Sequence, residues 1–218
     1  MNQIFPGVWQ KNKHIFTRNL VPGDRTYSKN LVSWKGHEYR EWNPYRSKPA
    51  AAIMNGLKIF PVIEKAKILY LGIASGQTAT FFSDITGKEG IVYGVEISER
   101  CLRDLNPIAD KRGNIVPVLG DARKPEEYDW IEKVDVVYED VASDDQTPIM
   151  VRNAEHFLKP NGFAMIAIKA RSIDVVKRPK EIYKQELAKL KKHFKILDRV
   201  NLEPYEKDHM FVVMKKKP

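Results

Sequence analysis

The chain has 218 residues, of which 43% are hydrophobic and 30% charged, enough for the core of one domain of ordinary size. Lys and Arg outnumber Asp and Glu by 37 to 28, and the net charge of +9 suits either a polyanionic partner or simply a solvated basic surface. The single cysteine excludes an internal disulfide, no segment has the ~18 apolar residues that would span a bilayer, and the N-terminus lacks a signal-peptide pattern, so we expect a soluble intracellular protein.

Residues 1–45 differ in composition from the rest of the chain. They contain three of the four tryptophans and turn signals at Pro6-Gly7 and Pro22-Gly23-Asp24. Short aromatic and β-branched runs between these turns predict strands at 7–10, 13–18 and 38–42, and therefore a small antiparallel β domain. A unit of this size is too short to be stable alone, so we expect it to pack on the remainder of the chain.

From residue 46 to 218, helical and strand patterns alternate, which predicts an α/β domain with a parallel sheet covered on both faces. The first helix is Ala-rich, and Ser47 is its predicted N-cap. The last two strands are joined by a short loop without a helix, so they must pair antiparallel or lie apart. The predicted helices are 47–55, 77–86, 98–111, 146–158 and 179–192, and the predicted strands are 68–71, 91–97, 114–119, 134–138, 163–168, 194–201 and 209–215.

A loop of small residues, Gly72-Ile73-Ala74-Ser75-Gly76, comes after the first strand of this domain and opens a helix. Its glycines allow a sharp turn and the close approach of a ligand, and the helix N-terminus favours a carboxylate or phosphate. The spacing is G-x-x-x-G and not the G-x-G-x-x-G of dinucleotide-binding folds, which favours a smaller ligand. The sequence of this loop by itself does not distinguish a ligand-binding loop from a tight turn that binds nothing.

Two acids come after the next two strands. Glu96 lies 20 residues after Gly76, where a doubly wound fold places a carboxylate that accepts hydrogen bonds from ribose hydroxyls. Asp121 comes after the third strand, where it can accept from an adenine amino group. Each acid alone could be a cap or a turn residue. Together with the glycine loop they predict a nucleoside-binding site at the carboxyl edge of one sheet.

Five segments of the chain resemble fibrillarin, particularly its compact archaeal form. The first is also common to methyltransferases that use S-adenosylmethionine, and the last two are specific to the family. The segments are LGIASGQT at 71–78, VEIS at 95–98, EDVASDDQ at 139–146, IKARSID at 168–174 and LEPYEKDH at 202–209.

The resemblance implies the Rossmann-like fold of class I methyltransferases over residues 46–218, with a seven-stranded sheet whose last strand is antiparallel, and a small N-terminal β domain over residues 1–45. It implies S-adenosylmethionine as the cofactor and no metal. Where this chain has Ser143, the family usually has Gln. The implied cofactor contacts are Gly72, Ser75, Gly76, Thr78, Ala79, Glu96, Ile97, Asp121, Ala122, Val141, Ala142 and Ser143.

The family's catalytic Lys-Asp-Lys-His tetrad maps to Lys48, Asp140, Lys169 and His209. The resemblance implies methyl transfer to a ribose 2′-hydroxyl, which needs an in-line approach and removal of the hydroxyl proton. Either a lysine with a lowered pKa takes this proton, or Asp140 takes it while the lysines stabilise the developing alkoxide. Taken singly, each residue could equally be a surface lysine, a helix cap or a strand-end histidine.

The resemblance also implies partners. These are a box C/D guide RNA that pairs with target rRNA or tRNA, a Nop-domain scaffold protein, and a kink-turn-binding protein, in the cytoplasm of an archaeal cell and without a membrane. Base pairing would then select the sequence, because a duplex minor groove displays 2′-hydroxyls but little sequence information. Two alternatives remain at this point: a methyltransferase for small molecules, and an RNA-binding scaffold that has kept the fold without catalysis.

Overall fold

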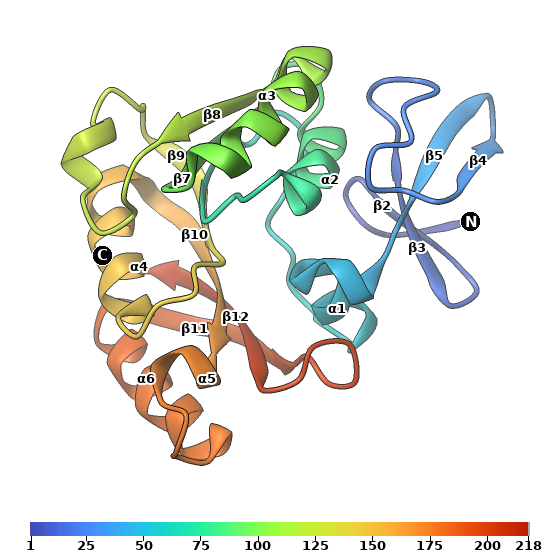
Figure 1. The fold of residues 1–218 in the computed structure, drawn as a ribbon. Coiled ribbons are helices and arrows are strands. Elements are labelled where there is room, and N and C mark those ends of the chain that lie inside the picture. The colour runs from blue at the N-terminus through green and yellow to red at the C-terminus, as the bar shows by residue number, and fades with distance from the viewer. Residues whose placement is uncertain (218) are drawn as a thin grey trace.

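A computed structural model describes residues 1–217, which form two sheets and their flanking helices (Figure 1). The strands are β1 (Asn2–Phe5), β2 (Val8–Lys11), β3 (His14–Arg18), β4 (Leu31–Trp34), β5 (His37–Trp42), β6 (Lys67–Leu71), β7 (Ile91–Glu96), β8 (Ile115–Leu119), β9 (Val134–Glu139), β10 (Leu158–Lys169), β11 (Phe194–Asn201) and β12 (His209–Lys216). The α-helices are α1 (Lys48–Met54), α2 (Gln77–Thr86), α3 (Glu99–Arg112), α4 (Gln146–Phe157), α5 (Ala170–Ile173) and α6 (Pro179–His193), and two short 3₁₀ helices cover Pro44–Arg46 and Pro125–Tyr128.

The larger sheet has seven strands in the order β11-β12-β10-β9-β6-β7-β8. The strands from β10 to β8 are parallel, and β12 is antiparallel to both of its neighbours. Alternate side chains of β6 show why this sheet is buried on both faces: Ile68 and Tyr70 pack into one core and Leu69 and Leu71 into the other. The predicted α/β fold class, with its antiparallel last strand, is confirmed.

Helices cover the two faces of this sheet. Apolar residues of α1, α2 and α3 form one core with the sheet, and those of α4 and α6 form the other. The predicted helix 77–86 matches α2. In this part of the chain, most of the other helix and strand boundaries lie within a few residues of the predicted ones. No helix within residues 1–217 is both long and apolar enough to cross a membrane.

The N-terminal residues form a five-stranded antiparallel sheet in the order β1-β2-β3-β5-β4, beside α1 and α2 (Figure 1). Trp42 of this sheet is fully buried and stacks on Phe81 of α2, with ring centroids 5.2 Å apart. The N-terminal sheet therefore shares its core with the helices α1, α2 and α3, as its small size predicts.

A buried ionic network joins the N-terminal sheet to α2 and α3. Asp84 of α2 is 2.8 Å from Arg40 of β5 and also contacts Arg112 of α3, and all three side chains have 0% exposure. Arg112 in addition pairs with Asp24 at 3.0 Å. The hydroxyl of Thr17 donates to Asp84 at 2.6 Å. Because buried charges are stable only when paired and hydrogen-bonded, this network fixes the N-terminal sheet on α2 and α3.

Two strands, one α-helix and the two short 3₁₀ helices were not predicted. The strands β1 and β4 are short edge segments, and the single turn of α5 comes directly after β10. Short edge strands have weak periodicity because only one neighbour and one face constrain them. Ser47 occupies the N-cap position of α1 as predicted, but its hydroxyl lies 2.9 Å from that of Thr78 and makes no cap hydrogen bond.

Candidate active site

The sheet brings the predicted site residues to one edge. Asp140 comes directly after β9, Lys169 ends β10, and the glycine loop joins β6 to α2. The central order β10-β9-β6-β7 makes these strand ends neighbours. His209 begins β12, and its Cα lies opposite that of Lys169 in the antiparallel register. Residues that are far apart in the sequence therefore line one side of the glycine loop.

The glycine loop packs directly on the backbone of Asp140, just beyond β9. Gly72 has φ +78°, and a Cβ there would lie 3.1 Å from the carbonyl carbon and oxygen of Asp140. Gly94 in the neighbouring strand β7 gives room to Ile73, whose Cδ1 would be 2.1 Å from a Cβ at that position. Glycine at both positions is therefore a packing requirement, and the loop and Asp140 are held in fixed relative positions.

Asp140 lies between the ammonium groups of two lysines. Its Oδ1 is 2.9 Å from Lys169 Nζ and 3.1 Å from Lys48 Nζ, in ionic contacts without hydrogen-bond geometry. Lys48 Nζ donates to Oδ2 at 3.3 Å, and Lys169 Nζ donates to the backbone oxygen of Asp140 at 2.6 Å. The three side chains are only 12–16% exposed, so water screens these charges less than at an open surface.

His209 is neutral near pH 7 in this environment. Burial lowers the pKa of its imidazole below 6.5, and the nearby ammonium groups of Lys48 and Lys169 lower it further. Nδ1 lies 2.6 Å from the carbonyl oxygen of Lys207. A carbonyl oxygen only accepts, so Nδ1 carries the proton and Nε2 is left as an acceptor.

The two predicted nucleoside acceptors lie at the ends of β7 and β8. Glu96 accepts from the backbone N–H of Ala74 at 2.9 Å and from that of Ser98 at 3.0 Å. Its carboxylate retains further lone pairs for ribose hydroxyls. Ile97, at 65% exposure, presents an apolar side chain at the same edge. Asp121 accepts from the backbone N–H of Arg123 at 2.9 Å, in the manner of a turn residue, and keeps its other oxygen for a donor.

The other predicted cofactor residues divide into two groups. Ser75, Gly76, Val141 and Ala142 belong to the loops after β6 and β9. The side chains of Thr78, Ala79 and Ala122 are buried against the protein, so a ligand would meet their backbone. Thr78 and Ala79 lie in the first turn of α2, so their backbone N–H groups have no partner within the helix and point toward its N-terminus and the glycine loop.

The side chain of Ser143 is hydrogen-bonded within the protein. The residue is only 7% exposed. Its hydroxyl accepts a hydrogen bond from Arg123 at 2.7 Å and contacts the carboxylate of Asp145. Gln146, which the sequence did not single out as a site residue, has the bridging role in this loop. Its amide donates to the carbonyl of Val141 at 3.2 Å and accepts from the backbone N–H of Lys169 at 3.0 Å. Its place in the family segment at 139–146 was the one available signal.

Glu139, directly before Asp140, is a second residue that the sequence did not single out. Both oxygens of its carboxyl group are buried without a hydrogen-bond partner among residues 1–217. Burial and then the negative charge of Asp145 raise the pKa of this carboxyl well above its usual value. In sequence, a glutamate at a strand end resembles an exposed acid, but Glu139 is only 1% exposed.

These residues form a site with a cofactor side and a reaction side. Acceptors for hydroxyl and amino groups, an apolar side chain and a helix N-terminus fit a nucleoside that carries an amino acid, as in S-adenosylmethionine. A carboxylate between two ammonium groups, beside a neutral imidazole, fits the removal of a proton and the stabilisation of an oxyanion.

Comparison with known proteins decides the family. The Fibrillarin family model matches residues 1–218. The chain belongs to the fibrillarin family. It is 52% identical, over 97% of its length and 96% of the relative's, to the fibrillarin-like rRNA/tRNA 2′-O-methyltransferase of Pyrococcus furiosus. The predicted resemblance to fibrillarin, particularly to its archaeal form, is confirmed.

Solved structures of fibrillarins agree with this membership. The fibrillarin pre-rRNA processing protein of Methanococcus jannaschii has a TM-score of 0.94 at 46% identity, covering 99% of this chain and 96% of that one. Aeropyrum pernix fibrillarin, crystallised with natively bound S-adenosyl-L-methionine, has a TM-score of 0.85 at 50% identity over 92% and 88% of the chains. The fibrillarin of a fibrillarin/Nop5p complex has a TM-score of 0.84 at 38% identity over 97% and 98%.

Proposed function

We propose that this fibrillarin-family chain transfers the methyl group of S-adenosylmethionine to ribose 2′-hydroxyls of rRNA and tRNA, at sites selected by a box C/D guide RNA. The observation that carries the proposal is the carboxylate of Asp140 between the ammonium groups of Lys48 and Lys169, at the sheet edge next to the glycine loop. The names of relatives that match nearly the whole chain support the reaction and the RNA substrate.

Bound at the glycine loop, S-adenosylmethionine would supply an electrophilic methyl group on a positively charged sulfur. Gly72 to Ala79, Glu96, Ile97, Asp121, Ala122 and residues 141–143 would hold it. A fibrillarin crystallised with this cofactor supports the assignment.

Asp140 is the proton acceptor that the geometry favours. Its carboxylate lies between the ammonium groups of Lys48 and Lys169, which donate hydrogen bonds and do not accept them. Attack of the ribose oxygen on the methyl carbon makes its hydroxyl proton strongly acidic, and a weak base such as a carboxylate can then take it. The two ammonium groups stabilise negative charge that develops on the oxygen. Nε2 of the neutral His209 is a second acceptor at this site.

The proposed partners are the box C/D guide RNA with its target, a Nop-domain scaffold and a kink-turn-binding protein that acts through the RNA and the scaffold. The solved fibrillarin/Nop5p complex supports the scaffold partner. The cytoplasm is the proposed location. We also propose that residues 1–45 form a small N-terminal domain and 46–218 the catalytic domain, with the buried ionic network between them.

The test is reconstitution with radiolabelled S-adenosylmethionine. The chain alone should bind the cofactor but methylate RNA poorly, and addition of scaffold, kink-turn protein and guide should give a 2′-O-methyl group at the guided nucleotide, mapped by resistance to alkaline hydrolysis. A guide with a mismatch at the target is the control. Efficient transfer to small-molecule acceptors, or cofactor binding without any transfer, would contradict the proposal and favour one of the two alternatives.

A further inference from the structure

Two buried tyrosines lie next to Asp140 in the core. Tyr138 is two residues before Asp140 on β9, and its partner in the parallel register on β6 is Tyr70. They are 0% and 3% exposed, and their ring centroids are 4.6 Å apart. The hydroxyl of Tyr138 donates to Oδ2 of Asp140 at 3.4 Å. Within residues 1–217 it is the one neutral donor to this carboxylate, because Lys48 and Lys169 supply the other contacts.

The hydroxyls of the two tyrosines are not needed for packing. Both rings pack on Phe82 of α2, with centroid distances of 5.5 and 5.9 Å, and Tyr138 also packs on Phe211 of β12 at 5.9 Å. Phenylalanine would fill the same space, whereas a buried hydroxyl without a partner costs free energy. The presence of the hydroxyls is therefore explained by what they contact, and for Tyr138 that is Asp140.

Both tyrosines keep their protons at neutral pH and can act as donors. Burial and then the negative charge of Asp140 raise the pKa of each hydroxyl well above 10. The one hydroxyl proton of Tyr138 is directed to Asp140, which leaves the phenol oxygen to accept from the hydroxyl of Tyr70. The hydroxyl of Tyr70 also interacts with that of Thr78, in the first turn of α2.

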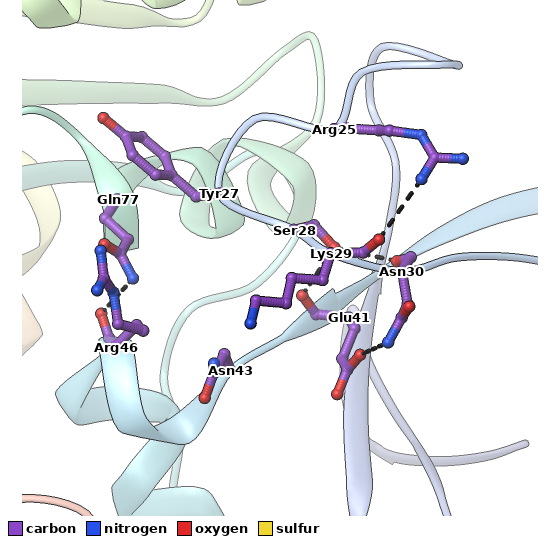
Figure 2. A pocket seen from close by; sticks show the side chains of 9 residues that line it. All are labelled: Arg25, Tyr27, Ser28, Lys29, Asn30, Glu41, Asn43, Arg46 and Gln77. Carbon is purple, nitrogen blue, oxygen red and sulfur yellow. Dashed lines mark hydrogen bonds between the residues drawn. The ribbon is translucent and has the colours of Figure 1, made fainter.

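The first turn of α2 also holds the residues that lead into α1. Oγ1 of Thr78 is 2.9 Å from Oγ of Ser47, and both residues are buried. The neighbouring residues make a second link, because the side chain of Gln77 donates to the carbonyl of Arg46 at 2.7 Å (Figure 2). One helix turn is therefore connected to the start of α1 on one side and, through the two tyrosines, to Asp140 on the other.

A carboxylate that takes a proton must be held in one orientation. Lys48 and Lys169 are long, flexible side chains that can follow the carboxylate if it turns, so they hold its charge better than its plane. The ring of Tyr138 is fixed by its aromatic neighbours, so its hydroxyl gives Oδ2 a fixed partner. Orientation matters for the rate, since a misplacement of about 1 Å can cost on the order of 100-fold.

We infer that Tyr138 is a positioning residue for Asp140: its hydroxyl holds the carboxylate in the orientation for proton removal and connects it, through Tyr70 and Thr78, to the helix turn that follows the glycine loop. The inference rests on the proposed function and deepens it, because it explains how the proton acceptor and the cofactor loop keep one relative geometry. It gives the buried aromatic cluster a role in the reaction rate as well as in stability.

The test deletes single hydroxyl groups and keeps the rings. Tyr138→Phe removes only the donor to Asp140. The matched control is Tyr183→Phe, because the hydroxyl of Tyr183 on α6 is buried in the other core without a hydrogen-bond partner among residues 1–217. Each variant is assembled into the guided particle, and single-turnover methylation is measured against the concentrations of cofactor and of target RNA.

The expected effect is a slower reaction with unchanged binding. A hydrogen bond to a charged group contributes about 10- to 100-fold, and at 3.4 Å this one is long. We therefore expect Tyr138→Phe to lower the rate at saturation by about five- to tenfold, with both half-saturating concentrations unchanged. Tyr183→Phe should react at the wild-type rate, and the Tm of both variants should stay within about 2–4 °C of wild type. Tyr70→Phe should slow transfer less than Tyr138→Phe, because it acts through Tyr138.

Coupling to Asp140 separates positioning from a general structural effect. In an Asp140→Asn background, which lacks the proton acceptor, Tyr138→Phe should cost less than about twofold, since the two residues act as one unit. An equal loss in both backgrounds would overturn the inference, as would a wild-type rate for Tyr138→Phe or a similar loss from Tyr183→Phe. A wild-type particle that transfers no methyl group to guided RNA would instead refute the proposed function, and the inference with it.

Discussion

Loss of the negative charge of Asp84 should destabilise the whole chain. This carboxylate is the acid that pairs with Arg40, whereas Arg112 keeps Asp24 as a second partner at 3.0 Å. Breaking a buried ion pair by removing one partner costs about 3–5 kcal/mol. Because one of the two arginines remains paired, we expect Asp84→Asn to cost about 3 kcal/mol, near the lower limit. For a domain of this size that lowers Tm by about 6–12 °C.

Urea unfolding measures this loss, and Asp104→Asn is the matched control, since Asp104 is exposed on α3, the helix that carries Arg112. The urea midpoint should fall for Asp84→Asn without a change in the m-value, and Asp104→Asn should stay within about 0.5 kcal/mol of wild type. If both variants lose the same small amount, the network does not hold the N-terminal sheet in place, and the energetic argument is wrong.

Three further predictions concern the site. Glu96→Ala should weaken cofactor binding by about 10- to 100-fold in calorimetry, because a hydrogen bond to a charged group contributes about 1.5–3 kcal/mol; unchanged affinity would mean that the cofactor lies elsewhere. Burial raises the pKa of Glu139 in the folded state above its unfolded value of 4.5. The contribution of this shift to stability is fully present below pH 4.5 and is lost as the pH rises through the folded-state pKa. Glu139→Gln should therefore raise Tm more at pH 8 than at pH 5, and an equal change at both pH values would refute the raised pKa of Glu139. The pKa of His209 is lowered below 6.5, so the rate contribution of its neutral form should be lost only on acidification below pH 6.5, and His209→Ala should remove that part of the profile.

The sequence predicted most of the large sheet because its strands are buried on both faces. Runs such as Ile68–Leu71 have few alternatives to a buried strand, and the helices between them have clear apolar periodicity. The edge strands β1 and β4 were not predicted. Each has only four residues and pairs with one neighbour, so its hydrophobic alternation is too short to recognise.

The site was predictable where chemistry coincides with a strand end. Glu96, Asp140 and Lys169 are polar residues that end apolar runs or come directly after them, and the topology of a parallel sheet brings such positions to one edge. Glu139 and Gln146 were not predictable in the same way. Both are only 1% exposed, although polar residues of these types mostly lie at the surface, so the local sequence does not distinguish them from exposed residues.

The central claim is that Asp140 and the two lysines carry out the chemistry. Its most direct test is single-turnover methyl transfer in the assembled particle, with cofactor and target RNA saturating, for Asp140→Asn and Lys169→Ala. Each variant should bind the cofactor and assemble normally, and each should lose about 10²–10⁴-fold in rate, with the double variant losing much less than the product of the two. Near wild-type rates for both single variants would mean that the ion pairs are structural and that the proton leaves by another route.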